Sequence, residues 1–234
     1  MMLKNVLFPK KDARLYMSFM HVTFASLLIG GLMGLLQTLS RSGEFQLPFG
    51  INYYTILTVH GVILGLVLTT FFIVGFQFAL MGKTVGMSDK QRKWAWVAFW
   101  TMLVGTITAA ITILVGQANV LYTFYAPLRA HAAFYIGLAL VIVGSWIAVF
   151  VNFRQLYVWK KAHPGQKSPL LAFMVVINMA MWFIASLGVA TSVLIQFIPW
   201  SLGYAATINV LLSRTLFWYF GHPLVYFWLL PAYM

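Results

Sequence analysis

Long apolar runs separated by short polar stretches repeat along the whole chain. A helix that spans a membrane needs about 20 mainly apolar residues. Six runs reach this length, and they cover residues 15–37, 53–81, 95–116, 131–153, 170–199 and 208–234. The pattern therefore predicts an all-α fold, a polytopic transmembrane helix bundle with six helices in this chain.

The polar stretches between these runs differ in charge. Twelve of the 15 lysine and arginine residues lie before the first run, between the second and third, or between the fourth and fifth. The other three, Arg41, Arg129 and Arg214, lie on the opposite side of an alternating topology. Because basic loops are retained in the cytoplasm, we expect a cytoplasmic N-terminus.

The composition supports the membrane assignment and narrows the chemistry. Hydrophobic residues make up 62% of the chain and charged residues 8%, which excludes an ordinary soluble domain. The net charge is +12, but the basic residues form short clusters between apolar runs, so we expect no nucleic-acid partner. The chain has no cysteine and only three acids, so any metal site has to use histidine, carboxylate or the tyrosine phenol. We expect one membrane domain over residues 1–234.

Three of the five histidines have ordinary explanations. His163 lies in a basic loop before a Pro-Gly turn, and His131 begins the fourth run at an interface. His21 lies about two turns inside the first run, where a packing role competes with proton uptake. In the same run, Gly30 and Gly34 belong to a stripe of small residues that predicts close helix packing.

His60 is different because apolar residues flank it on both sides in "ILTVHGVILG". A neutral imidazole is a common axial ligand of haem iron, and Gly61 next to it would let a flat macrocycle approach the backbone. No acid or second histidine lies nearby in the sequence as a partner. We interpret His60 as a metal-ligand candidate, with a hydrogen-bonded packing role as the alternative.

His222 and Tyr226 in "FGHPLVYF" form the strongest local constellation. Their i, i+4 spacing places them on one helix face, with Cβ atoms about 5–6 Å apart. Pro223 frees the carbonyl of Tyr219, and Gly221 removes bulk just before it, so the helix can bend at this point. The spacing alone fits a metal site and a kinked helix with a hydrogen-bonded histidine equally well.

Helix geometry relates these candidates in depth. At 1.5 Å per residue, His60 and His222 lie roughly 10–12 Å below the same membrane boundary, as two neighbouring redox centres would require. Tyr233 follows Tyr226 by seven residues, on the same face and about 10 Å nearer the cytoplasm. We therefore expect protons to be relayed along that face.

These segments resemble a known family. "FGHPLVYFWLLPAY" is similar to the sixth helix of subunit I of haem-copper oxygen reductases, the cytochrome c oxidase type, and "LTVHGVILG" is similar to their second helix. "VLYTFYAPLRAH" and "LLSRTLFWYFGHP" resemble the B-type branch. Leu224 stands where the A-type branch has glutamate, which implies a single proton channel. The resemblance covers about the first half of that subunit's twelve or more helices.

The resemblance also implies roles for individual residues. It makes His60 an axial ligand of the low-spin haem and His222 one of three histidine ligands of the active-site copper. It makes Tyr226 the catalytic tyrosine covalently joined to His222, which donates an electron and a proton during O–O cleavage. Tyr233 would belong to the proton path. The remaining ligands would lie beyond Met234, so we expect this chain alone to lack a complete active site.

The function implied is that of a core subunit of a terminal respiratory oxidase, which reduces O2 to water and translocates protons. The implied cofactors are a low-spin b-type haem, a high-spin a- or o-type haem and copper. The implied partners are subunit II with its own copper site for accepting electrons, cytochrome c or a similar donor, O2 and membrane lipid. The implied location is the prokaryotic plasma membrane. The alternatives are a nitric oxide reductase, which lacks the tyrosine, and a membrane transporter or scaffold without enzymatic activity.

Overall fold

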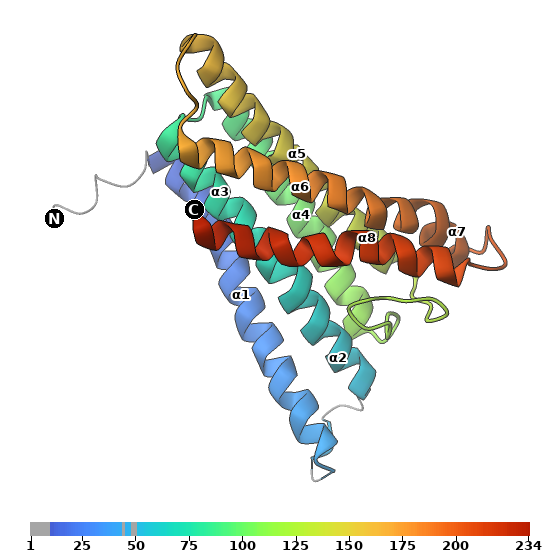
Figure 1. Cartoon of the computed structure of the whole chain (residues 1–234). Helices are drawn as coiled ribbons and strands as arrows, with labels where there is room; N and C mark the ends of the chain where they lie inside the picture. The colour runs from blue at the N-terminus through green and yellow to red at the C-terminus, as the bar shows by residue number, and fades with distance from the viewer. Residues whose placement is uncertain (1–9, 44, 48–50) are drawn as a thin grey trace.

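The protein consists of helices and connecting loops over residues 10–43, 45–47 and 51–234, which the computed structural model describes. Its first four long elements run back and forth along one direction (Figure 1). They are α1 (Lys10–Arg41), a second segment made of α2 (Tyr53–Val62), η3 (Ile63–Leu68) and α3 (Thr69–Thr84), then α4 (Asp89–Leu114) and α5 (Ala132–Ala162). The last two are α6 (Leu170–Ser192) with η4 (Val193–Phe197) and α7 (Ile198–Ser201), and α8 (Val210–Leu229) with η5 (Leu230–Tyr233).

The helical bundle predicted from the apolar runs is confirmed. Within the described residues, five helical segments are long and apolar enough to cross a membrane. The sixth predicted helix is present as α8, which lies outside that group of five. At 1.5 Å per residue, the 20 residues of α8 extend about 30 Å, the thickness of a bilayer core.

Several helices extend beyond their apolar runs because polar residues cap or continue them. α4 begins at Asp89 and not at residue 95, since Ser88 and Gln91 form a reciprocal capping box there. α5 continues to Ala162 through a basic last turn that suits the negative end of the helix dipole. The apolar runs predict the membrane portions of these helices, whereas local capping decides where the helices end.

Two long segments change locally to π-helix. The wider turn of η3 leaves the Gly65 carbonyl available, and the side chain of Thr69, the first residue of α3, donates a hydrogen bond to it at 2.7 Å. η4 comes directly before Ile198 and Pro199, where the proline ring removes a backbone donor and crowds the carbonyl four residues earlier. A hydrophobic run does not reveal such turns, because they alter backbone pairing without altering apolarity.

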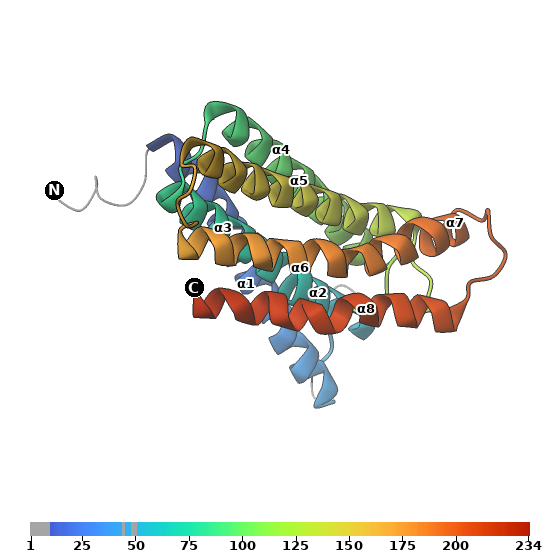
Figure 2. The same cartoon turned by 45° about the horizontal axis from the view of Figure 1, so that its top comes forward.

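The basic stretches that the alternating topology predicts on one side lie at one end of the bundle. The start of α1, the connection from α3 to α4 and the connection from α5 to α6 all lie at that end (Figure 2). There Arg92 of α4 pairs with the buried Asp12 of α1 at 2.5 Å and also with Asp89. The Gln155 side chain of α5 donates to the Gly86 carbonyl at 2.9 Å. We name this the basic end of the bundle.

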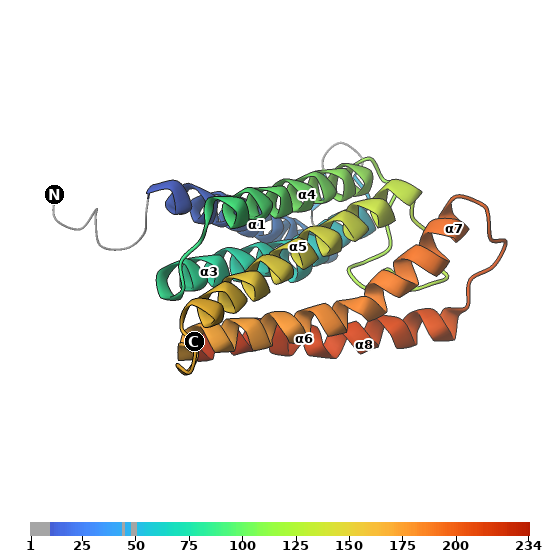
Figure 3. The same ribbon diagram turned by 90° about the horizontal axis from the view of Figure 1, so that it is seen from above.

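Helices α4 and α5 pack against each other through glycines on both helices. A Cβ atom at Gly105 would lie 2.5 Å from the Gly137 carbonyl oxygen, and one at Gly144 would lie 2.9 Å from the Met102 backbone nitrogen. Since no side chain separates the two backbones here, the helices approach closely, as small residues allow in membrane proteins. Away from this contact the two helices diverge toward the basic end (Figure 3).

The glycine contact generates a stability prediction. Gly105→Ala places a methyl group against backbone that cannot move aside, so we expect a loss of about 1–3 kcal/mol in the free energy of unfolding. Thermal denaturation of the complete protein in detergent measures this loss. Gly31→Ala on α1 is the matched control, because no heavy atom lies within 4 Å of its added Cβ. Equal melting temperatures for the two variants would contradict the assigned contact.

Candidate functional site

The imidazole of His60 is held against α1 by a hydrogen bond to backbone. Its Nδ1 lies 2.8 Å from the Gly30 carbonyl oxygen. A carbonyl oxygen only accepts hydrogen bonds, so Nδ1 is the protonated nitrogen and Nε2 keeps its lone pair. This is the arrangement in which a second hydrogen bond orients a metal-binding histidine. The ring is therefore prepared to bind a metal through Nε2.

The glycines of α1 create the space for this ring. A Cβ atom at Gly34 would lie 2.7 Å from His60 Cε1 and 2.8 Å from its Nδ1. A Cβ atom at Gly30 would collide with the Leu64 side chain of η3. The small-residue stripe predicted for helix packing thus also seats His60. The four-residue recurrence of small residues was the sequence signal for this contact, but it did not indicate which side chain fills it.

His222 and Tyr226 lie together on α8, with ring centroids 4.8 Å apart at an interplanar angle of 68°. Both side chains are exposed, Tyr226 to 47%. The opposite face of α8 is buried, since Phe227 stacks on Trp182 of α6 with centroids 4.3 Å apart. The predicted pair therefore exists as a pair, and it faces away from the described helices.

Tyr233 lies in η5 and not in a continuation of α8. A 3₁₀-helix turns about 120° per residue instead of 100°, so Tyr233 is displaced by about 60° around the axis from the expected α-helical position. Its side chain is 68% exposed, on a chain segment that follows exposed Tyr226. The geometry retains both phenols at accessible positions, and the role of Tyr233 in proton transfer stays a prediction.

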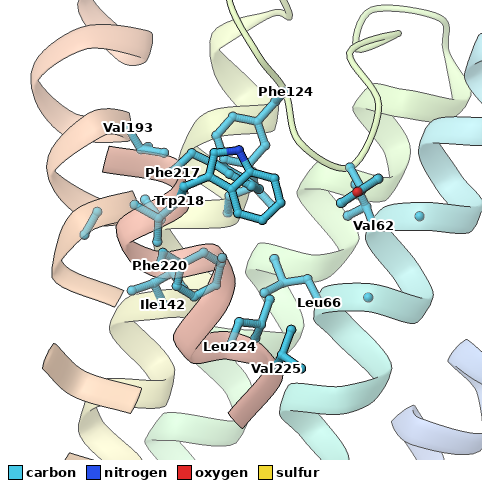
Figure 4. Close-up of a pocket in the computed structure, with 18 of the residues that line it drawn as sticks. Val62, Leu66, Phe124, Ile142, Val193, Phe217, Trp218, Phe220, Leu224 and Val225 are labelled. Atoms are coloured by element: carbon cyan, nitrogen blue, oxygen red, sulfur yellow. The ribbon is translucent and has the colours of Figure 1, made fainter. Parts of the chain in front are cut away.

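An apolar cavity of about 220 Å³ lies between α2, α5, α6 and α8 (Figure 4). Its lining includes Gly61 and Gly221, which are the chain neighbours of His60 and His222. Neither imidazole lines the cavity itself. The structure therefore places the chain neighbours of the two histidines around one space, as a common depth requires, but leaves the imidazole rings outside it.

The loop between α4 and α5 closes one side of this cavity through Tyr122 and Phe124. Its backbone is fixed to α2, because the Leu121 amide donates to Thr58 Oγ1 at 2.9 Å. The loop is also fixed to α7, where the Arg129 side chain donates to the Trp200 carbonyl at 2.6 Å. These hydrogen bonds connect helices that are far apart in sequence, and the predicted elements alone did not place the loop.

Phe124 in this loop has a strained backbone that packing holds in place. Its φ of 38° lies in the left-handed region, which bulky side chains rarely adopt. The buried ring packs edge to face against Phe197 at 5.4 Å and against Phe217 at 5.3 Å between centroids. Aromatic contacts from two helices thus offset the strain and hold the ring over the cavity.

The other three histidines lie outside the cavity, and His21 lacks the packed position expected of it. His131 caps α5, since its Nδ1 accepts from the Ala133 amide at 3.2 Å. His163 ends α5, with Nδ1 2.9 Å from the Trp159 carbonyl oxygen and its ring stacked on that indole. His21 is exposed on α1. None of the three lines the apolar cavity.

His60 and His222 can each contribute one ligand to a metal or haem site. Within the described residues, no group of three or more histidine, cysteine, aspartate or glutamate side chains could hold a metal ion. His60 offers one oriented nitrogen, and His222 offers one exposed imidazole beside a phenol. Each residue can supply one ligand to a site that other groups complete.

Comparison with known proteins gives consistent relatives. Residues 14–234 match the family "Cytochrome C and Quinol oxidase polypeptide I". Cytochrome c oxidase subunit 1 of Thermus thermophilus is 37% identical over 97% of this chain and 41% of its own length. Heme-copper oxidase subunit I+III of Aeropyrum pernix is 28% identical over 92% of this chain and 28% of its own length.

A solved structure shows the same fold. A heme-copper terminal oxidase dimer, determined by cryo-EM, matches with a TM-score of 0.88 and 41% identity. The alignment covers 96% of this chain and 39% of that chain. The chain thus spans roughly two-fifths of the length of the relative from Thermus thermophilus and of the solved oxidase chain.

The hydrogen bond from the loop to α2 can be tested directly. Thr58→Val keeps the side-chain shape but removes the acceptor of the Leu121 amide. An unpaired buried donor costs about 1–3 kcal/mol, so we expect amide exchange in the loop to accelerate about 10- to 100-fold. Hydrogen exchange measured by mass spectrometry checks this. Thr108→Val is the control, because that hydroxyl bonds only within its own helix; equal exchange in both variants would refute the role of Thr58.

Proposed function

Because the chain belongs to the family of cytochrome c and quinol oxidase polypeptide I, we propose that it is part of the core subunit of a terminal respiratory oxidase. In this proposal, the whole enzyme reduces O2 to water at a haem-copper centre and couples the reaction to proton translocation. The observation that carries the proposal is the His222–Tyr226 pair. The centroids of its imidazole and phenol rings lie 4.8 Å apart on an exposed helix face.

We propose His60 as one axial ligand of the low-spin haem. The hydrogen bond from Nδ1 to the Gly30 carbonyl supports this role, because it leaves Nε2 as the binding atom and fixes the ring plane. Gly34 supports it as well, since the ring lies where any larger residue would stand. The haem supplies reversible one-electron redox chemistry when bound, and His60 provides orientation and one ligand bond.

We propose His222 as one of three histidine ligands of the active-site copper, with Tyr226 as the catalytic tyrosine joined to it. The exposed position of both side chains supports this assignment, because the other ligands have to approach from outside the described helices. Tyr226 holds a phenolic proton beside the ligand and can deliver it, together with an electron, to oxygen. Tyr233 would hold the next position on the proton path, toward the basic end.

Further parts of the proposal concern the complete enzyme. We propose a B-type enzyme with a low-spin b-type haem, a high-spin a- or o-type haem and a single proton channel, in keeping with Leu224. Subunit II, with its own copper site, would pass electrons from cytochrome c or a similar donor. The basic end would face the cytoplasm of a prokaryotic plasma membrane, because basic loops are retained on that side.

Two substitutions in the complete oxidase separate the proposed roles. Tyr226→Phe removes the phenolic proton but retains the ring, so we expect O2 consumption to fall about 100-fold or more with copper content unchanged. His222→Asn should lower copper content as well as O2 consumption. His163→Gln is the control for loss of an imidazole outside the proposed site. Full O2 turnover in Tyr226→Phe, or nitric oxide turnover that exceeds O2 turnover in the unmodified enzyme, would refute the proposal.

The seat of His60 allows a spectroscopic prediction. Gly34→Ala places a methyl group 2.7 Å from His60 Cε1, which forces the imidazole to turn or shift. We expect the low-spin haem bands in the optical spectrum to shift or weaken, while copper content stays unchanged. Gly31→Ala, also on α1 but without neighbours within 4 Å, should leave the spectrum as it is. An unchanged spectrum in Gly34→Ala would contradict the ligand role of His60.

A further inference from the structure

A second concave feature lies outside the proposed redox site. It is a surface groove of about 420 Å³ between α4 and α5, at the basic end of the bundle. Lys90 and Trp94 line it from α4, and Phe150, Arg154 and Val158 line it from α5. We name it the α4/α5 groove. It shares no lining residue with the apolar cavity beside the histidines.

The groove is a consequence of how α4 and α5 pack. The glycine contact at Gly105 and Gly137, near the start of α5, brings the backbones together, and the helices diverge from there toward the basic end (Figure 3). At the basic end, the hydrogen bond from Gln155 to the Gly86 carbonyl connects α5 with the loop before α4. The groove thus lies between a close contact and an anchored end, so it is a built feature of this helix pair.

The chemistry of the groove changes with depth. Lys90 is the second residue of α4, and Trp94 lies four residues further along, about 6 Å deeper at 1.5 Å per residue. On the antiparallel α5, Arg154 stands at the same end, and Ile147 lies about 10 Å deeper. The cations therefore lie nearer the basic end than the apolar residues Trp94, Phe150 and Ile147, and Val158 alone of the apolar lining lies beyond Arg154. A phospholipid has the same order, with an anionic phosphate above acyl chains.

The charge of Lys90 and Arg154 favours an anionic ligand. Neither Lys90 nor Arg154 forms an ion pair within the described part of the chain. Asp89 is the nearest acid in sequence, and its carboxylate is paired with Arg92. The Arg154 guanidinium lies 5.0 Å from the centre of the Tyr157 ring, which orients it without neutralising it. Both cations thus line the same groove without an acidic partner among the described residues.

The deeper apolar part of the groove suits an acyl chain in a membrane. Phe150 lies about 6 Å deeper than Arg154 and is 54% exposed, so it is open to whatever surrounds α5. Trp94 is 51% exposed, and tryptophan is enriched at the level of lipid headgroups. Basic pockets between helices near this interface bind anionic lipid headgroups. We propose that the α4/α5 groove binds one anionic phospholipid, with its phosphate at Lys90 and Arg154 and an acyl chain along Phe150.

This site is independent of the proposed oxygen chemistry, because it requires only that the chain lies in a membrane. Its partner is a lipid and not a free anion, since the deeper apolar residues contribute nothing to the binding of a soluble phosphate. A folded complete protein with altered redox chemistry would still be expected to bind the lipid. Failure of lipid binding and failure of oxidase activity are therefore separate results.

The test is native mass spectrometry of the complete protein in detergent with equal amounts of phosphatidylglycerol and phosphatidylcholine of identical acyl chains. We expect one tightly bound phosphatidylglycerol, with an affinity about 10-fold above that for phosphatidylcholine. Combined Lys90→Gln and Arg154→Gln should abolish this preference. Combined Lys83→Gln and Lys167→Gln, which removes two exposed cations outside the groove, should retain it. Thermal denaturation verifies that both variants are folded.

Two results would overturn the proposal. The first is an unchanged preference for phosphatidylglycerol in the folded Lys90→Gln and Arg154→Gln variant, or equal competition by soluble glycerol phosphate. The second comes from a photo-crosslinking amino acid at position 94 in native membranes. A lipid adduct there supports the proposal, whereas a crosslink to another protein subunit shows that protein fills the groove.

Discussion

Close backbone contact at small residues is the constraint on which this structure depends. Lipid tails are as apolar as the helix surfaces, so burial of apolar side chains gives little drive for helices to associate within a membrane. Helices instead associate where glycines let them approach. This happens between α4 and α5 at Gly105 and Gly137, and between α6 and α8, where a Cβ at Gly188 would lie 2.7 Å from the Leu216 carbonyl.

The same constraint prepares the proposed haem ligand. Gly30 and Gly34 bring α1 so close to α2 that a backbone carbonyl of α1 reaches the His60 imidazole. A larger residue at either position would hold the helices apart and leave Nδ1 without this partner. Packing and chemistry are therefore one arrangement, in which the contact that joins two helices also selects which nitrogen of His60 can bind a metal.

Helix α8 divides its two faces between packing and chemistry. Its aromatic face packs against α6 through Phe220 and Phe227, both in contact with Trp182. The other face presents His222 and Tyr226 outward. The apolar cavity lies beside α8. Phe124 closes it, on a loop that hydrogen bonds fix to distant helices. A rigid buried face thus supports an open face that is able to join further ligands.

Hydrophobicity, charge and i, i+4 spacing are local properties, so the six helices, the alternation of basic ends and the pairing of His222 with Tyr226 follow from the sequence alone. These local properties did not reveal the π-helical turns, the change to 3₁₀-helix before Tyr233 or the position of the loop that carries Phe124. The three-dimensional arrangement was needed to show that Gly30 orients His60 and that α4 and α5 open a groove toward the basic end. Those features arise from contacts between segments far apart in the chain, and no periodicity in the sequence records which partner each glycine meets.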